Sequence, residues 1–208
     1  MLETLQKTSP TDKVKMDSTR SQSAGKTLEV SEIEKGWLAG LIDGEGNVSL
    51  HKHGRGRKIP RCTVINTDFT IIERYADILK RLGIGCYVNH QDKKKSGDNW
   101  NNTKSAEVQG FKRFRALVEE VLPNLTGIKK VKAEASLAFV YSRLTKPGEG
   151  RGIFGEYDPT ELYLVDLLLN GFKGNPNEYT PEWIDNIHKI YSDLHRQYAE
   201  AAEMTARP

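Results

Sequence analysis

The stretch that decides the fold is LAGLIDGEG, residues 38–46. It joins an apolar run to two carboxylates, Asp43 and Glu45, and it carries glycine where a helix would favour alanine. A glycine inside a helix costs roughly 0.5–1 kcal/mol relative to alanine. The stretch therefore indicates either an unfavourable helix end or a helix that gains something from a surface without side chains.

A helix is predicted over about residues 32–42, because Ser31 and Glu34 have the spacing of a capping box. Three glycines four residues apart share one face of this helix. A strip of this kind lets a second helix approach to backbone contact, as small residues do between membrane helices. The strip consists of Gly36, Gly40 and Gly44. The apolar residues of the segment are expected to face the body of the domain: Ile33, Trp37, Leu38, Leu41 and Ile42.

The residues that follow predict two strand pairs, each followed by a helix. Strands are expected at 47–53, 59–66, 85–91 and 105–111, and helices at 69–83, 112–122 and 132–144. Four antiparallel strands with one apolar face covered by helices leave the other face polar and open. The predicted fold class is therefore α+β, with an α-β-β-α-β-β-α core, a four-stranded antiparallel saddle, helices on one face of the sheet, and additional C-terminal helices.

Three regions are expected along the chain. Residues 1–28 have little apolar periodicity and are predicted to be a flexible tail, residues 29–144 form the core, and residues 145–208 form a linker and a helical extension. A second copy of the opening motif is expected to be absent, because the best candidate, residues 164–175, has no acid at the end of its helix.

The charge distribution points to a polyanionic partner. Residues 47–115 carry 15 lysines and arginines against 6 aspartates and glutamates, whereas residues 145–208 carry 6 against 11. Such one-sided charge favours a nucleic-acid surface. No apolar stretch approaches the roughly 18 residues of a membrane span, so no membrane partner is expected. Cys62 and Cys86 match no metal or redox spacing and are expected to be reduced thiols in an intracellular protein.

The open sheet face and its basic loops are the predicted DNA-binding surface. Amides, hydroxyls, histidines and arginines there can pair with base edges and phosphates in a major groove. His51 and His53 share a strand face, but no third ligand has zinc spacing, so they are assigned to DNA rather than to a metal. The predicted DNA-binding residues are Asn47, Ser49, His51, His53, Arg55, Arg57, Lys58, Arg61, Thr63, Asn89, Gln91, Lys93, Lys94, Lys95, Ser105, Glu107 and Gln109.

The quoted stretch resembles the signature of the LAGLIDADG homing endonuclease family. Seven of its nine letters match, and the departures are Gly44 for alanine and Glu45 for aspartate, which keep a small residue and a carboxylate. The predicted order of elements also resembles one complete family core, with a lysine cluster before the last helix of that core. The resemblance implies a Mg²⁺-dependent double-stranded DNA endonuclease of the single-motif, homodimeric type, in which Mn²⁺ can substitute. Its target would be a long pseudo-palindromic DNA site, reached inside the cell.

The resemblance also implies roles for individual residues. Glu45 matches the catalytic acid and metal ligand, and the carbonyl of Gly44 would lie near the metal. Lys130 matches the active-site lysine, with Lys129 and Lys132 as the alternatives if the register is shifted, and Asn66 matches a polar active-site position. The homodimer would form through the helix at 32–43, with Gly36, Trp37, Gly40 and Asp43 at its interface and Asp43 in a structural role.

One alternative remains open at this point. A protein of the same fold can bind nucleic acid without cutting it, either as an intron RNA maturase or as a DNA-binding regulator. RNA would be a partner only under the maturase alternative. The retained carboxylate of Glu45 and the lysine cluster favour the endonuclease.

Overall fold

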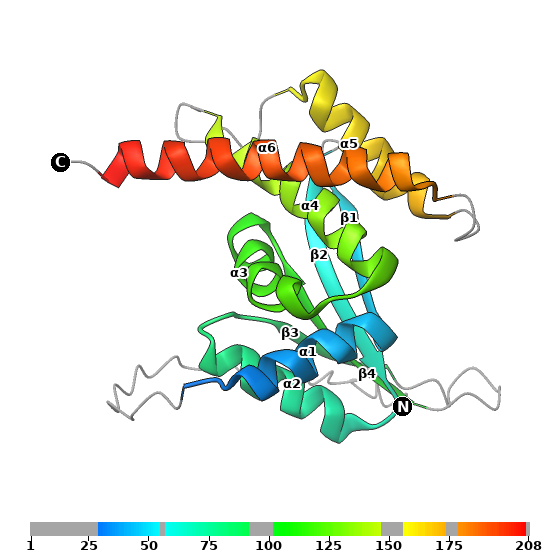
Figure 1. The fold of residues 1–208 in the computed structure, drawn as a ribbon. Coiled ribbons are helices and arrows are strands. Elements are labelled where there is room, and N and C mark those ends of the chain that lie inside the picture. Colours follow the sequence, from blue (N-terminus) through cyan, green and yellow to red (C-terminus); the bar gives the residue numbers. More distant parts are fainter. Residues whose placement is uncertain (1–28, 55–56, 92–101, 147–155, 174–178, 207–208) are drawn as a thin grey trace, which may run out of the picture.

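The computed structural model describes residues 29–54, 57–91, 102–146, 156–173 and 179–206 and shows an α+β fold with one four-stranded antiparallel sheet (Figure 1). The helices are α1 (Glu32–Glu45), α2 (Phe69–Arg81), α3 (Phe111–Val121), α4 (Gly127–Thr145), α5 (Pro159–Leu169) and α6 (Pro181–Ala206). The strands are β1 (Gly46–His53), β2 (Arg57–Asn66), β3 (Tyr87–Gln91) and β4 (Thr103–Gln109). Two short 3-10 helices are η3 (Leu122–Asn124) and η5 (Gly171–Lys173). The predicted order of elements is confirmed.

The capping box at the start of α1 is present as predicted. The Ser31 hydroxyl accepts from the Glu34 backbone N–H at 3.3 Å, and the Ser31 backbone N–H donates to Glu34 Oε2 at 3.0 Å. The helix then runs three residues beyond its predicted end, to Glu45. Both motif carboxylates therefore belong to the last turn of α1.

The sheet has the strand order β1-β2-β4-β3. One face packs into the core and the other is open, and the predicted alternation is confirmed for β1 and β2, whereas the adjacent residues Ser105 and Ala106 of β4 are both buried. The strand residues that are buried on the core face are Val48, Leu50, Cys62, Val64, Ala106 and Val108. All five residues of the outer strand β3 are exposed, so burial does not distinguish the two faces of this strand.

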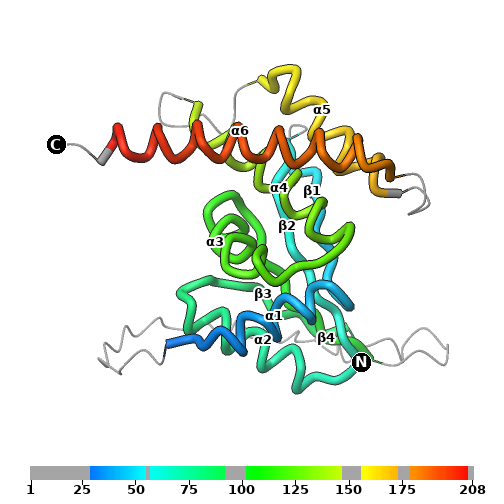
Figure 2. Tube along the Cα trace, in the orientation of Figure 1, coloured from blue at the N-terminus to red at the C-terminus, as the bar shows by residue number. Residues whose placement is uncertain are grey.

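The helix α4 lies at the centre of the molecule, between the sheet and α6 (Figures 1 and 2). Its residues from Ala133 to Arg143 are all buried. The helices α5 and α6 belong to the same hydrophobic cluster, because Leu164 and Ile187 are fully buried in it. The extension therefore packs onto the core. None of the described helices combines the length and the apolar character that crossing a membrane requires.

One core residue of the prediction is wrong. Ile33 is 83% exposed on α1 rather than facing the body of the domain. Leu38 and Ile42 are buried as predicted, while Trp37 and Leu41 are half-buried. Ile33 lies in the first turn of α1, where no described element covers it.

Candidate active site

The junction between α1 and β1 fixes the position of Glu45. Glu45 is the last residue of α1 and its side chain is exposed, and Gly46 begins β1 directly after it. A Cβ atom on Gly46 would lie 2.6 Å from the carbonyl oxygen and 2.7 Å from the Cα atom of Ile42. Only glycine lets the strand leave the helix so closely, so this glycine holds the carboxylate at the foot of the sheet.

Asp43 has a structural role in the fold. Its Oδ2 accepts from the Thr126 backbone N–H at 3.1 Å and from the Thr126 hydroxyl at 2.9 Å. Thr126 is the N-cap residue of α4, and its own side chain makes no capping hydrogen bond. Asp43 therefore caps α4 from α1, which agrees with the structural role that the resemblance implied.

The lysine that contacts the C-terminal end of α1 is Lys129, which belongs to α4. Its ammonium donates to the carbonyl oxygen of Gly46 and to that of Ile42, the latter at 3.4 Å. The carbonyls at a helix C-terminus carry partial negative charge, and no basic residue of α1 itself lies in its last turn. Lys129 therefore supplies the positive charge that this helix end lacks.

The other two lysines of the cluster lie elsewhere. Lys130, the predicted active-site lysine, lines a pocket with Tyr179 and His188, the latter on α6. The Lys132 ammonium lies 5.7 Å from the centre of the Phe172 ring, and burial together with the charge of Lys129 lowers its pKa. Of the three lysines, Lys129 is therefore the one that contacts the end of α1, where Glu45 lies.

Asn66 lies at the same end of the sheet as Glu45. Gly46 pairs with Val64, and Asn66, the last residue of β2, follows two positions later. The Asn66 side-chain oxygen accepts from the Asp68 backbone N–H at 2.8 Å, and Asp68 is the N-cap of α2. Asn66 thus takes part in the turn into α2 next to the candidate site.

The open sheet face gathers polar side chains in rows across the strands. Thr63 pairs with Asn47 on one side and with Glu107 on the other, and Arg61 lies between Ser49 and Gln109. Arg61 forms an ion pair with Glu107 at 3.3 Å. Among the described residues, Ser49 Oγ, Thr63 Oγ1 and Arg61 Nε are shielded from solvent without a hydrogen-bond partner.

The remaining predicted DNA-binding residues divide into three groups. His51, His53 and Arg57 share the open face near the β1–β2 turn, and Asn89, Gln91 and Ser105 share it on the far strands. Ser105 is nevertheless buried, contrary to its prediction as a DNA-contacting residue. Lys58 does not: strand alternation places it with Pro60 and Leu50, on the side of the sheet that the helices cover. Four predicted residues lie outside the described residues: Arg55, Lys93, Lys94 and Lys95.

Two further residues of the open face were not among the predicted DNA-binding residues. Ile65 is 45% exposed on the same face as Thr63, and Tyr87 is 49% exposed opposite Glu107. Strand alternation starting from the core residue Val64 contains the signal for Ile65, because alternate residues point to opposite faces. An apolar side chain here suits the methyl group of thymine.

The glycine strip of α1 faces open space. A Cβ atom added at Gly36, Gly40 or Gly44 would meet no described atom within 4 Å outside the backbone of α1. The neighbouring Ile33 is exposed as well. Packing within the described residues therefore does not require glycine at these three positions, in contrast to Gly46.

Comparison with known proteins shows a similarity in the central part of the chain. A family described as a LAGLIDADG-like domain matches residues 32–121, from the first residue of α1 to the end of α3. No curated protein matches the chain significantly.

Solved structures with a similar fold include DNA complexes. The homing endonuclease I-CvuI, crystallised with the I-CreI target in the presence of 2 mM Mg, is 21% identical, with 78% of this chain and 95% of that chain covered and a TM-score of 0.48. The LAGLIDADG homing endonuclease I-GzeII, in complex with its DNA target, is 14% identical, with 65% and 42% covered and a TM-score of 0.44. The motif at residues 38–46 and the strands β1 to β4 lie within the residues that the family matches. Residues 32–121 of the chain are thus similar to a LAGLIDADG-like domain.

Proposed function

We propose that this protein is a site-specific homing endonuclease that hydrolyses both strands of a long, pseudo-palindromic DNA site. The observation that carries the proposal is the position of Glu45. Its exposed carboxylate lies at the foot of an open polar sheet face, beside the Lys129 ammonium and at the end of a helix whose glycine strip is uncovered. A nuclease needs these parts together: a carboxylate, a cation and a surface that fits DNA.

The proposed active form is a symmetric homodimer. Close packing of α1 against α1 of a second copy would use the glycine strip, where two backbones can approach without side chains between them. A two-fold axis beside α1 repeats every contact in both subunits. The two Glu45 carboxylates would then lie on either side of this axis, one for each DNA strand.

The residues at the end of α1 fit a hard divalent cation as half of a shared site. Among the described residues, no group of three or more His, Cys, Asp or Glu side chains lies close enough to hold a metal ion. Mg²⁺ keeps several waters in proteins and is often held by one or two carboxylates together with substrate phosphates. The Glu45 carboxylate and the Gly44 carbonyl would hold it, and Mn²⁺ would substitute. When bound, the cation would supply Lewis acidity and lower the pKa of a coordinated water.

The protein residues would orient the phosphate and balance its charge. Lys129 would place its ammonium near the negative charge that develops on the phosphate oxygens during hydrolysis. Asp43, whose Oδ2 is committed to Thr126, would keep α1 and α4 in register and take no part in the reaction. Asn66 would orient water near the scissile phosphate from the end of β2.

The open sheet face would read each half-site in the major groove. Amide, hydroxyl and guanidinium groups on this face can donate to and accept from base edges. The ion pair between Arg61 and Glu107 would orient the guanidinium without consuming all of its donors, because Arg61 Nε has no partner among the described residues. The basic balance of residues 47–115 would add phosphate contacts, which make binding weaken as salt rises.

Selection from a DNA library tests the proposal. Double-stranded DNA with a randomised palindromic region is incubated with the protein and Mg²⁺, and cut ends are sequenced. We expect the wild type to cut one sequence class, and Glu45→Gln to cut it at least about 100-fold more slowly while still binding it. Glu203→Gln, an exposed glutamate far along α6, is the matched control and should cut normally.

The same experiment separates the alternative functions. A wild type that binds a DNA site and never cuts it would be a DNA-binding regulator. Retention of structured RNA in place of DNA would indicate a maturase. Normal cutting by Glu45→Gln would show that the catalytic carboxylate lies elsewhere.

A further inference from the structure

β2 extends beyond β4, the strand that pairs with one of its two edges. β2 pairs with β4 only from Arg61 to Asn66, and the last link on this edge is the Gly110 backbone N–H, which donates to the Pro60 carbonyl at 3.1 Å. Backbone groups two residues apart in a strand point in the same direction. The Lys58 N–H therefore points toward an edge at which β4 has already ended.

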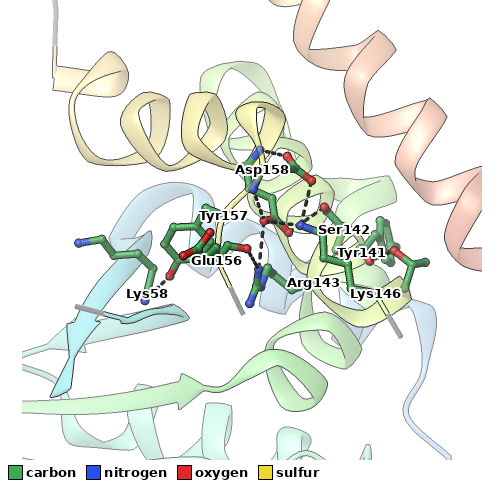
Figure 3. A network of polar contacts seen from close by, with 10 residues as sticks. Lys58, Tyr141, Ser142, Arg143, Lys146, Glu156, Tyr157 and Asp158 are labelled. Atoms are coloured by element: carbon green, nitrogen blue, oxygen red, sulfur yellow. Dashed lines mark hydrogen bonds and ion pairs between the residues drawn. The ribbon is translucent and has the colours of Figure 1, made fainter. Parts of the chain in front are cut away.

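The C-terminal extension supplies the missing acceptor. The Lys58 backbone N–H donates to the phenol oxygen of Tyr157 at 2.8 Å, across 99 residues of sequence. Tyr157 lies immediately before α5, as Figure 3 shows beside Lys58. The extension thus completes the hydrogen bonding of the β1–β2 hairpin, on the side of the sheet opposite the open face.

The Tyr157 ring is fixed to the core by α4. The Phe139 ring contacts it edge-on with centroids 5.9 Å apart, and the Arg143 guanidinium lies 5.1 Å from its centre. Arg143 is held by Glu161 at 3.0 Å, and both side chains are fully buried. Arg143 also donates to the Glu156 carbonyl at 3.0 Å, so the residue before Tyr157 is held as well (Figure 3).

The hairpin that Tyr157 contacts is the part of β1–β2 farthest from Glu45. β1 has eight residues, and at about 3.3 Å per residue the turn lies roughly 25 Å from the end of α1. This length corresponds to about seven base pairs at 3.4 Å each. His53 and Arg57, on the open face of the hairpin, would therefore face the outer base pairs of a half-site.

We propose that Tyr157 is a positioning residue for DNA recognition: it fixes the angle of the β1–β2 hairpin from behind, and this sets discrimination at the outer base pairs of each half-site. The inference rests on the proposed function, because it assumes that the open face reads DNA. The hydrogen bond from Lys58 carries no base contact of its own and acts only through the strand. Inner base pairs, read near Glu45 where β4 covers β2, would be unaffected.

The test compares Tyr157→Phe with Tyr163→Phe. Both variants remove one phenol oxygen; that of Tyr163, on α5, accepts a hydrogen bond from Asn186 of α6 at 3.4 Å instead of from the hairpin. Amide exchange followed by NMR should show Lys58 losing protection about five-fold in Tyr157→Phe, the factor expected for one ordinary hydrogen bond. Selection from the palindromic DNA library should then show about five-fold weaker base discrimination at the outer positions of each half-site. Base discrimination at the inner positions should be unchanged.

The outcomes separate the inference from the function on which it rests. Failure of the wild type to select any DNA would remove the proposed function and this inference with it. If the wild type selects a site, unchanged Lys58 protection or an unchanged outer profile in Tyr157→Phe would overturn the inference alone. If Tyr157→Phe lost base discrimination equally at inner and outer positions, or if Tyr163→Phe lost the same discrimination, the effect would be a general structural one. Either result would also overturn the inference.

Discussion

The two carboxylates of the motif differ in role because of helix geometry. Residues two apart in an α-helix point about 200° away from each other. Asp43 is directed at Thr126 and caps α4, and Glu45 is left exposed at the start of the sheet. The different surroundings of the two carboxylates therefore follow from the helix running on to Glu45, and the proposed catalytic role belongs to the exposed one.

The lysine cluster leads to a prediction at the same scale. Lys129→Met should slow DNA cleavage by about 100-fold, because it removes the cation beside Glu45, and Lys130→Met should change the rate little. Single-turnover cleavage of the selected site measures both rates. If Lys130→Met slowed cleavage and Lys129→Met did not, Lys130 would be the active-site lysine. This result would contradict the assignment based on the contacts at the end of α1.

Among the elements, α1 is the one whose glycines are not explained by contacts within a single chain. Its glycines at 36, 40 and 44 cost helix stability, and no described atom packs against them. The exposed Ile33 extends the same uncovered surface. A second copy of the helix accounts for all four positions at once, which is why the proposed dimer axis lies beside α1.

The prediction for this element concerns the oligomeric state. Gly40→Leu should give a folded monomer, because a leucine on the strip separates the two helices while leucine favours the helix itself. Sedimentation analysis of the wild type and the variant measures this directly. Gly54→Leu is the matched control, since a Cβ at Gly54 also meets no described atom within 4 Å, and it should remain a dimer. A wild type that is monomeric with and without DNA would contradict the dimer.

For the whole molecule, the extension and the core form one packed unit. Arg143 on α4 and Glu161 on α5 are both fully buried and joined at 3.0 Å. Glu161 also accepts from Ser142 at 2.9 Å and from Lys146 at 2.7 Å. Such a pair is costly to break from one side, because the remaining charge stays buried.

This packing predicts cooperative unfolding. Glu161→Gln should lower the free energy of unfolding by about 3 kcal/mol and leave a single transition. Denaturant titration followed by both circular dichroism and tryptophan fluorescence measures this. Glu156→Gln, whose side chain is exposed, is the control and should change stability by less than about 0.5 kcal/mol. Loss of α5 and α6 alone in Glu161→Gln, with the sheet intact, would show that the extension is a separate unit.

Prediction from the sequence succeeded where local patterns carry the information. The capping box of Ser31 and Glu34 and the alternation around Cys62 and Val64 depend on near neighbours, and the structure confirms them. It failed where a side chain has a choice of direction: Ile33 is exposed, and Lys58 lies on the helix-covered side of the sheet. Periodicity gives the face of an element but not whether another element covers that face.

The sequence by itself determined the order of elements and the core face of the central strands, and it indicated LAGLIDGEG as the candidate site. These follow from spacing along the chain, because helix and strand periods are local properties. Only the tertiary structure decided that Lys129 rather than Lys130 lies at the end of α1, and that Tyr157 meets Lys58. Both contacts join residues more than 80 positions apart, and their geometry depends on how α4 packs, which no local pattern encodes.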